Sequence, residues 1–235
     1  MKIGVFSDSH YCSAERLGAN RRCSLSLDKT KQALEDFKKQ GVDVCVCLGD
    51  VIDHYHEGKS SKELLGEVSQ AVKNSGLPFL YAPGNHDYCC MSPEDIAGIL
   101  GVSVPPYSAE ICGCRFIVLD GNFDSNMVRF GSVPFDWKDS NLPKDQLDYL
   151  QKALEDSRLP CIVMVHEPLD PFTDEAHCIN NAADARKIIS ESGKVALVIQ
   201  GHYHCGADHI VDGIRYFTSD AMCNGEENHY TVIEV

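Results

Sequence analysis

The sequence predicts a single α/β domain over residues 1–235, built on one mixed sheet or on two sheets. Three observations lead to this prediction. Apolar runs alternate with helical patterns in the first half, as in a βαβαβ unit. The last third contains mainly hairpin patterns. Five apolar runs end in residues of the kinds that bind metal ions, which indicates that these ends share one edge.

In the first half, strands are expected at residues 2–6, 42–48 and 78–81. A helix is expected from about Leu25 to Gln40, because apolar residues recur there at helical spacing and Gly41 can end it. A second helix should follow the capping box that begins at Ser60 and should stop at Gly76.

In the second half, strands are expected at residues 107–111, 114–119, 161–165, 195–199, 207–211, 214–218 and 230–235. Helices are expected at 93–100, around 147–154, and up to Ser192 from an N-cap at Asn181. The segment 121–142 has no helical or strand period, so we expect a long loop, anchored by Trp137.

The composition is that of an ordinary soluble globular protein, with 43% hydrophobic and 24% charged residues. No run approaches the roughly 20 apolar residues that a membrane span requires. The N-terminus lacks a signal-peptide pattern, so we expect a cytoplasmic protein with no membrane partner. The net charge of -14 makes nucleic acid an improbable partner and requires local positive charge at any phosphate site.

The 12 cysteines do not predict a disulfide framework, because the chain is long and no export signal is present. Cys45 and Cys47 should share the face of a strand opposite Val42, Val44 and Val46, and we expect both to fill the core. Cys12 and Cys205 stand beside candidate ligands, and a structural role is expected for them as well.

Candidate metal ligands follow five of the expected strands. They are Asp8, His10, Asp50, Asn85, His166, His202 and His204. Individually, such residues often have local roles, since an aspartate can cap a turn or a helix. Their joint placement at strand ends favours a metal cluster. Mixed oxygen and nitrogen donors suit manganese, iron, zinc or nickel better than calcium.

Charge indicates what such a centre would bind. If Asp50 bridges two divalent ions, two carboxylates and one hydroxide leave roughly one positive charge, which a phosphate can neutralise. Two ions about 3.5 to 4 Å apart would activate the shared hydroxide that attacks phosphorus. His86 is then the expected proton donor to the leaving oxygen, and Asp53 could orient its ring.

The complete set of motifs resembles the calcineurin-like metallophosphoesterases. The matching blocks are Asp8-Ser9-His10, Gly49-Asp50-Val51-Ile52-Asp53, Gly84-Asn85-His86-Asp87, His166 and Gly201-His202-Tyr203-His204. The resemblance implies a four-layer α/β/β/α sandwich with two mixed β-sheets. It also implies one metal at Asp8, His10, Asp50 and His204, and another at Asp50, Asn85, His166 and His202. His86 and Asp53 match the family's acid and its partner.

The chain departs in part from the phosphoprotein phosphatases of this family, which have an arginine where it has His54. The stretch from Arg22 to Asp53 is more similar to the branch that cleaves ADP-ribose and CDP-alcohols. Four residues are candidate substrate contacts, namely Arg22, His54, His56 and His177.

The expected function is therefore a dinuclear phosphohydrolase that cleaves a phosphate ester or diphosphate of a small substrate, for which a nucleotide derivative is one option. Two alternatives remain open at this point. An inactive scaffold that binds proteins would typically have lost His86 or some ligands, and this chain keeps them all. A metal-dependent nuclease is disfavoured by the acidic charge and by the lack of a basic, aromatic face.

Overall fold

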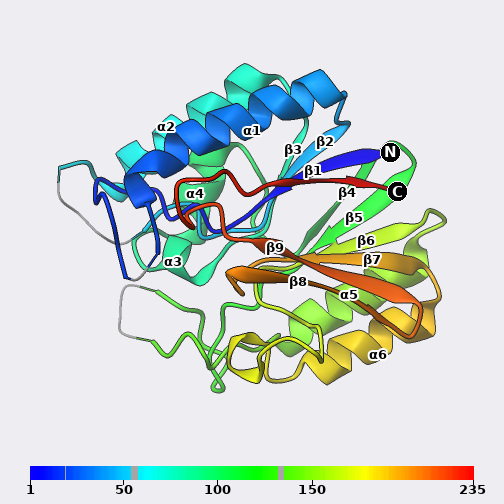
Figure 1. The fold of residues 1–235 in the computed structure, drawn as a ribbon. Coiled ribbons are helices and arrows are strands. Elements are labelled where there is room, and N and C mark those ends of the chain that lie inside the picture. The colour runs from blue at the N-terminus through cyan, green and yellow to red at the C-terminus, as the bar shows by residue number, and fades with distance from the viewer. Residues whose placement is uncertain (19, 54–57, 132–134) are drawn as a thin grey trace.

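In the computed structural model, which describes residues 1–18, 20–53, 58–131 and 135–235, two mixed β-sheets face each other between layers of helices (Figure 1). The four-layer sandwich that the motifs imply is therefore confirmed. Within the described residues, no helix combines the length and apolar character that a membrane crossing requires.

The first sheet has the strand order β10-β1-β2-β3. Its strands are β10 (Thr231–Glu234), β1 (Lys2–Phe6), β2 (Val44–Cys47) and β3 (Phe79–Tyr81). β1, β2 and β3 are parallel, whereas β10 pairs with β1 in the antiparallel sense. The carboxyl ends of the three parallel strands therefore lie at one end of the molecule, on the left in Figure 1.

The second sheet has the order β4-β5-β6-β7-β9-β8. Its strands are β4 (Tyr107–Ile111), β5 (Cys114–Val118), β6 (Cys161–Met164), β7 (Val195–Gln200), β9 (Ile214–Asp220) and β8 (Cys205–Val211). The central four strands are parallel, and the edge strands β4 and β8 each join by a hairpin. Asp212 and Gly213, at the second hairpin turn, have φ of 53° and 79°, as a type I′ turn requires.

Helices cover the outer face of each sheet. The helices are α1 (Ser26–Gln40), α2 (Ser61–Ser75), α3 (Asn85–Tyr88), α4 (Pro93–Leu100), α5 (Lys144–Asp156), α6 (Ala182–Ser192) and the short 3-10 helices η1 (Cys23–Leu25) and η2 (Glu175–His177). The capping box at Ser60 is present, and Gly41, Gly76 and Gly193 end helices in the left-handed conformation, as expected. Asn181 precedes α6, but its side chain makes no cap hydrogen bond and instead binds the backbone of Leu142.

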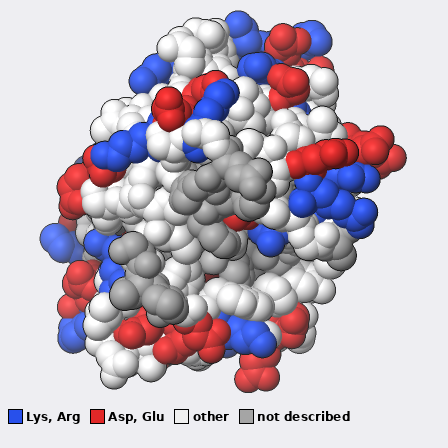
Figure 2. All heavy atoms as spheres, turned by 90° about the vertical axis from the view of Figure 1, so that its left-hand side faces the viewer, with Lys and Arg blue, Asp and Glu red and all other residues white. Residues whose placement is uncertain are grey.

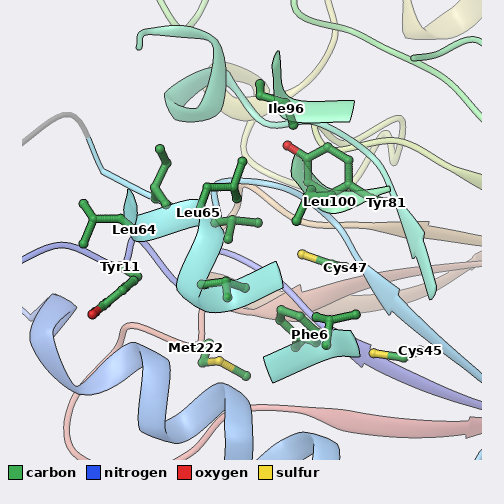
Figure 3. Packing of buried hydrophobic residues seen from close by; sticks show 14 of the residues in the cluster. Phe6, Tyr11, Cys45, Cys47, Leu64, Leu65, Tyr81, Ile96, Leu100 and Met222 are labelled. Carbon is green, nitrogen blue, oxygen red and sulfur yellow. The ribbon is translucent and has the colours of Figure 1, made fainter. Parts of the chain in front are cut away.

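The hydrophobic core has three parts, one between the sheets and one beneath each helical layer. Figure 3 shows the part beneath α1 and α2, where Cys45 and Cys47 point toward the helices, as predicted. Val44 and Val46 lie between the sheets. Val42 was wrongly placed with them: it precedes β2 and packs on the helical side. None of the 12 cysteines, all of which lie among the described residues, forms a disulfide bond.

Candidate metal centre

The loops that carry the candidate ligands are joined to one another by backbone hydrogen bonds. The amides of Asp8 and His10 donate to the carbonyls of Gly49 and Asp50, at 3.0 and 2.8 Å. Across two strands of the second sheet, the amide of Gly201 donates to the carbonyl of His166 at 2.9 Å. The carboxyl ends of strands from both sheets meet, and all seven candidate ligands lie at this junction.

Four of the candidate ligands have a left-handed backbone conformation that side chains other than glycine rarely adopt. The φ angles are 52° at Asp8, 44° at His10, 48° at Asp50 and 63° at His202. Such conformations cost of order 1–2 kcal/mol each, and they cluster at functional sites. They turn the backbone sharply after β1, β2 and β7, so that the side chains point into the junction.

Two glycines allow the loops after β2 and β3 to touch. Gly49 has φ of 90°, and a Cβ atom there would lie 2.3 Å from the backbone nitrogen of Gly84. A Cβ atom on Gly84 would lie 2.2 Å from Oδ1 of Asp50. Only hydrogen fits at these positions, which explains why both motifs contain glycine.

Each central carboxylate has one oxygen held by backbone and the other directed at the histidines. Oδ1 of Asp50 accepts a hydrogen bond from the amide of His86 at 2.8 Å. Oδ2 of Asp50 lies 3.5 Å from Nε2 of both His10 and His166. Oδ2 of Asp8 accepts from the amide of His202 at 3.0 Å, and its Oδ1 lies 3.4 Å from Nε2 of His204. Asp50 thus stands between two imidazoles.

In two of the imidazoles, the Nδ1 nitrogen contacts an oxygen atom that orients the ring. Nδ1 of His166 contacts the carbonyl oxygen of Leu48, and Nδ1 of His10 lies 3.2 Å from Oδ2 of Asp53. Because Nδ1 is engaged in both rings, Nε2 faces the junction. Metal-binding histidines are commonly fixed in this manner.

The donor set fits a pair of transition-metal ions. Four buried atoms aimed into the junction have no hydrogen-bonding partner in the described part of the chain, namely Oδ1 of Asp8, Oδ1 of Asn85 and Nε2 of His166 and His202. Ligand atoms of Asp50, His166 and His202 lie within 4.8 Å of one another. So do those of His10, Asp50 and His86, and those of His10, His204 and Cys223. Burying such polar atoms without a partner costs free energy of folding, unless a cation binds them.

The charged groups of the centre shift one another's pKa values. Burial would raise the pKa of Asp50, but His166 and His86 hold it well below its usual range. Burial opposes the charge on His166, yet the carboxylates of Asp50 and Asp8 raise its pKa well above the ordinary value. Burial and the neighbouring His166 lower the pKa of His202 well below its usual range. The carboxylate of Asp50 is thus ionised and His202 is neutral, as metal ligands must be, whereas His166 must release a proton when a metal ion binds.

His86 and Asp53 lie side by side at the junction. Nδ1 of His86 is 3.6 Å from Oδ2 of Asp53, and the same oxygen accepts a hydrogen bond from Nη1 of Arg21 at 2.9 Å. Burial lowers the pKa of His86, but Asp50 and Asp53 outweigh it and raise the pKa above the ordinary value. His86 can therefore carry a proton, as a general acid must.

The structure places the candidate substrate contacts in different positions. His177 lines the cavity at the junction, whereas Arg22 does not: its guanidinium lies 3.8 Å from the carboxylate of Glu226. Arg21, which no sequence pattern singled out, lines the cavity instead. Arg21 sits in short bridges to Leu17 and Asn224, and successive side chains of an extended segment point to opposite sides. His54 and His56 lie outside the described residues.

Two further residues at the centre were given no role by the sequence, although Asp87 belongs to one of the matching blocks. Asp87 is fully enclosed and accepts hydrogen bonds from the amides of Val51 and Gly84, at 2.9 and 3.0 Å, so it ties the two loops together. Burial, with the charge of Asp50, raises its pKa to about 6. Cys223 lies beside His10 and His204, after β9. No strand-end pattern in the sequence marks Cys223.

A cavity of about 390 Å³ opens at the junction, lined by His10, Arg21, Asp50, Asn85, His86, Trp137, His177, His202 and His204. Trp137, which was expected to anchor its loop, is 36% exposed and contacts the imidazoles of His177 and His202. Figure 2 shows this end of the molecule, where Lys and Arg are interspersed with Asp and Glu outside the grey residues.

Comparison with known proteins agrees with the motifs. The model of the calcineurin-like phosphoesterase family matches residues 1–206. A probable cyclic nucleotide phosphodiesterase of Synechococcus sp. is 29% identical over 211 residues, which cover 87% of this chain and 73% of that protein. The 3',5'-cyclic adenosine monophosphate phosphodiesterase CpdA of Escherichia coli K12 is 23% identical, over 77% of this chain and 61% of its own.

Among solved structures, a dimetal phosphatase from Danio rerio superposes with a TM-score of 0.81 at 18% identity, over 98% of this chain and 91% of that one. At this identity the likeness establishes the fold alone.

Proposed function

This chain is a phosphoesterase of the calcineurin-like family, and we propose that it uses two metal ions to hydrolyse a diester or diphosphate bond in a small phosphorylated substrate. One observation carries the proposal. Oδ2 of Asp50 lies 3.5 Å from Nε2 of His10 and from Nε2 of His166, so it stands between two groups of donors. On this proposal, Asp8, His10, Asp50 and His204 hold one ion, and Asp50, Asn85, His166 and His202 hold the other.

When bound, the two ions would activate a water as the nucleophile and offset the charge of the phosphate. The residues of the chain supply the rest. His86 donates a proton to the leaving oxygen, because it lines the cavity and its pKa is raised by Asp50 and Asp53 despite burial. Asp53 orients the rings of His86 and His10 from behind.

Arg21 adds a positive charge to that expected from the metal ions. Its guanidinium lines the cavity, and Nη1 lies 2.9 Å from Asp53 and 3.3 Å from Nδ1 of His10. A guanidinium has five N–H donors, so the bond to Asp53 leaves others for a phosphate oxygen. Arg21 therefore binds substrate in the position for which the sequence suggested Arg22 or His54.

The size of the cavity supports a small substrate. Small-molecule sites typically enclose roughly 300–1,000 Å³, and the value here is about 390 Å³. Because several relatives are named as cyclic nucleotide phosphodiesterases, nucleotide diesters come first among the substrates to test.

The test is a substrate screen of manganese-loaded protein against bis(p-nitrophenyl) phosphate, p-nitrophenyl phosphate, 3',5'-cyclic AMP and ADP-ribose. We expect turnover of at least one diester or diphosphate, and its loss in Asp50→Asn. If protein that binds two metal ions per chain hydrolyses neither the diesters nor ADP-ribose, the proposal is refuted, and loss of activity on all four compounds favours the inactive scaffold.

A further inference from the structure

The cavity has an aromatic wall formed by Trp137 and His177, next to the candidate ligand His202. The ring centroids of Trp137 and His177 are 5.0 Å apart, and those of Trp137 and His202 are 5.5 Å apart. Tyr203 lies beside His177, with its ring centroid 5.2 Å away. The wall thus begins directly beside the metal centre.

Packing of the core does not account for this wall. Trp137 is 36% exposed and belongs to none of the buried clusters. The rings of His177 and His202 meet it at 47° and 65°, so neither stacks in parallel on the indole. Lys138 lies over the ring with its ammonium 5.3 Å from the centroid. Because Trp137 lines the cavity and is partly exposed there, a ligand can cover part of its apolar surface.

Hydrogen bonds hold the two segments that carry Trp137 and His177. Trp137 lies in a turn closed by a 3.0 Å hydrogen bond from the amide of Asp139 to the carbonyl of Asp136. His177 ends η2, and its Nδ1 lies 2.9 Å from Oδ2 of Asp174. Two loops from different parts of the second half therefore each place a ring at the same wall.

We infer that Trp137 and His177 form a stacking platform for the base of a nucleotide whose phosphate is held at the metal centre. The inference rests on the proposed function and specifies its substrate class. A ring against this wall and a phosphate near His202 and Arg21 would share one cavity of about 390 Å³. A nucleotide combines these two groups. Stacking of a base on an aromatic side chain strengthens binding by roughly 5- to 100-fold.

Fluorescence provides a direct test, because Trp137 is the only tryptophan among the 235 residues. Zinc-loaded protein is titrated with AMP and, separately, with ribose 5-phosphate, which has the same phosphate and sugar but no base. We expect saturable quenching with AMP, and a dissociation constant roughly 5- to 100-fold lower than that of ribose 5-phosphate. Equal dissociation constants, or no change of emission with AMP, would overturn the inference.

Variants separate stacking from a structural role. In calorimetric titrations, Trp137→Ala should bring the two dissociation constants to within about twofold of each other, whereas Trp137→Phe should keep most of the preference for AMP. Phe172→Ala is the matched control, because Phe172 is 67% exposed and contacts His209 of β8 rather than the cavity. A preference for AMP that survives Trp137→Ala refutes the inference.

These outcomes are distinct from failure of the proposed function. Hydrolysis of diesters without preference for a base would leave the phosphoesterase proposal intact and remove only the platform. If the metal-loaded protein binds AMP more tightly than ribose 5-phosphate but hydrolyses nothing, the platform is supported and the phosphoesterase proposal is refuted.

Discussion

At the scale of the residue, His86 decides whether the centre has its own general acid. It lines the cavity, and its Nδ1 lies 3.6 Å from Asp53. We predict that His86→Ala lowers kcat by roughly 10² to 10⁴, because general acid catalysis contributes about that much. Metal analysis of the same samples should show unchanged content. Full turnover in the variant would reject His86 as the acid.

Arg21 and Arg22 form a natural pair of test and control. Arg21 faces the cavity, whereas Arg22 lies 3.8 Å from the carboxylate of Glu226. Arg21→Ala should raise KM by roughly 10- to 100-fold, since a charge-assisted hydrogen bond contributes about 1.5–3 kcal/mol. Arg22→Ala should change KM by less than about twofold. The assignment is wrong if the two variants have the same KM.

The sequence predicted the candidate ligands better than the groups around them. Each ligand follows an apolar run, so its place was set by local pattern. Arg21 and Trp137 reach the cavity, and Cys223 reaches His10 and His204, from segments without such a signal. Neighbouring arginines look alike in a sequence, and the bridges of Arg21 to Leu17 and Asn224 are formed with segments that the local pattern does not identify.

At the scale of the element, the approach of two strand-end loops creates the centre. A Cβ atom on Gly84 would lie 2.4 Å from the backbone nitrogen of Asp50. Gly84→Ala should displace Asp50 and lower kcat/KM by roughly 10²-fold, as misplacement of a catalytic group by about 1 Å can. Activity at the wild-type level would contradict this account.

Gly66 provides the control for Gly84. It lies within α2, and a Cβ atom added there would have no neighbour within 4 Å, so Gly66→Ala should leave activity unchanged. Its free energy of unfolding should rise by up to about 1 kcal/mol, because alanine is the better helix former.

Strands and long helices were predictable because apolar spacing and caps are local features. The short helix α3 (Asn85–Tyr88) was not predicted. Its four residues are too few for a helical period, and the hydrogen bonds that Asp87 accepts from Val51 and Gly84 hold it in place. The sequence of the loop that carries Trp137 has neither helical nor strand periodicity, so it predicted no element there.

At the scale of the molecule, burial of an acid next to the centre affects stability. Glu167 is fully buried, and neither carboxylate oxygen has a hydrogen-bonding partner among the described residues. Burial raises its pKa from 4.5 to about 8, despite the opposing charge of His166. The folded state therefore keeps a proton that the unfolded state loses, and stability falls as pH rises from about 4.5 through 8.

We predict that Glu167→Gln removes part of the dependence of folding stability on pH in the metal-free protein. Each proton contributes a slope of about 1.4 kcal/mol per pH unit, so the variant should gain stability relative to wild type as pH rises. Urea unfolding at pH 6 and pH 9 measures the difference, and Glu35→Gln on the exposed face of α1 is the control. An identical pH dependence in wild type and Glu167→Gln would refute this role.

The layered architecture followed from the motifs, but the strand order did not. β9 lies between β7 and β8, so the chain leaves β7, forms the edge strand and returns to the interior. This order of strands depends on packing between segments that are distant in the sequence. It also brings Cys223, which follows β9, beside His10 and His204.

The central claim is that Asp50 bridges two metal ions. The most direct test is anomalous diffraction from crystals of manganese-loaded protein. We predict two anomalous peaks, one on each side of Oδ2 of Asp50, near His10 and near His166, and the loss of at least one in Asp50→Ala. A single peak, or peaks remote from Asp50, would contradict the account.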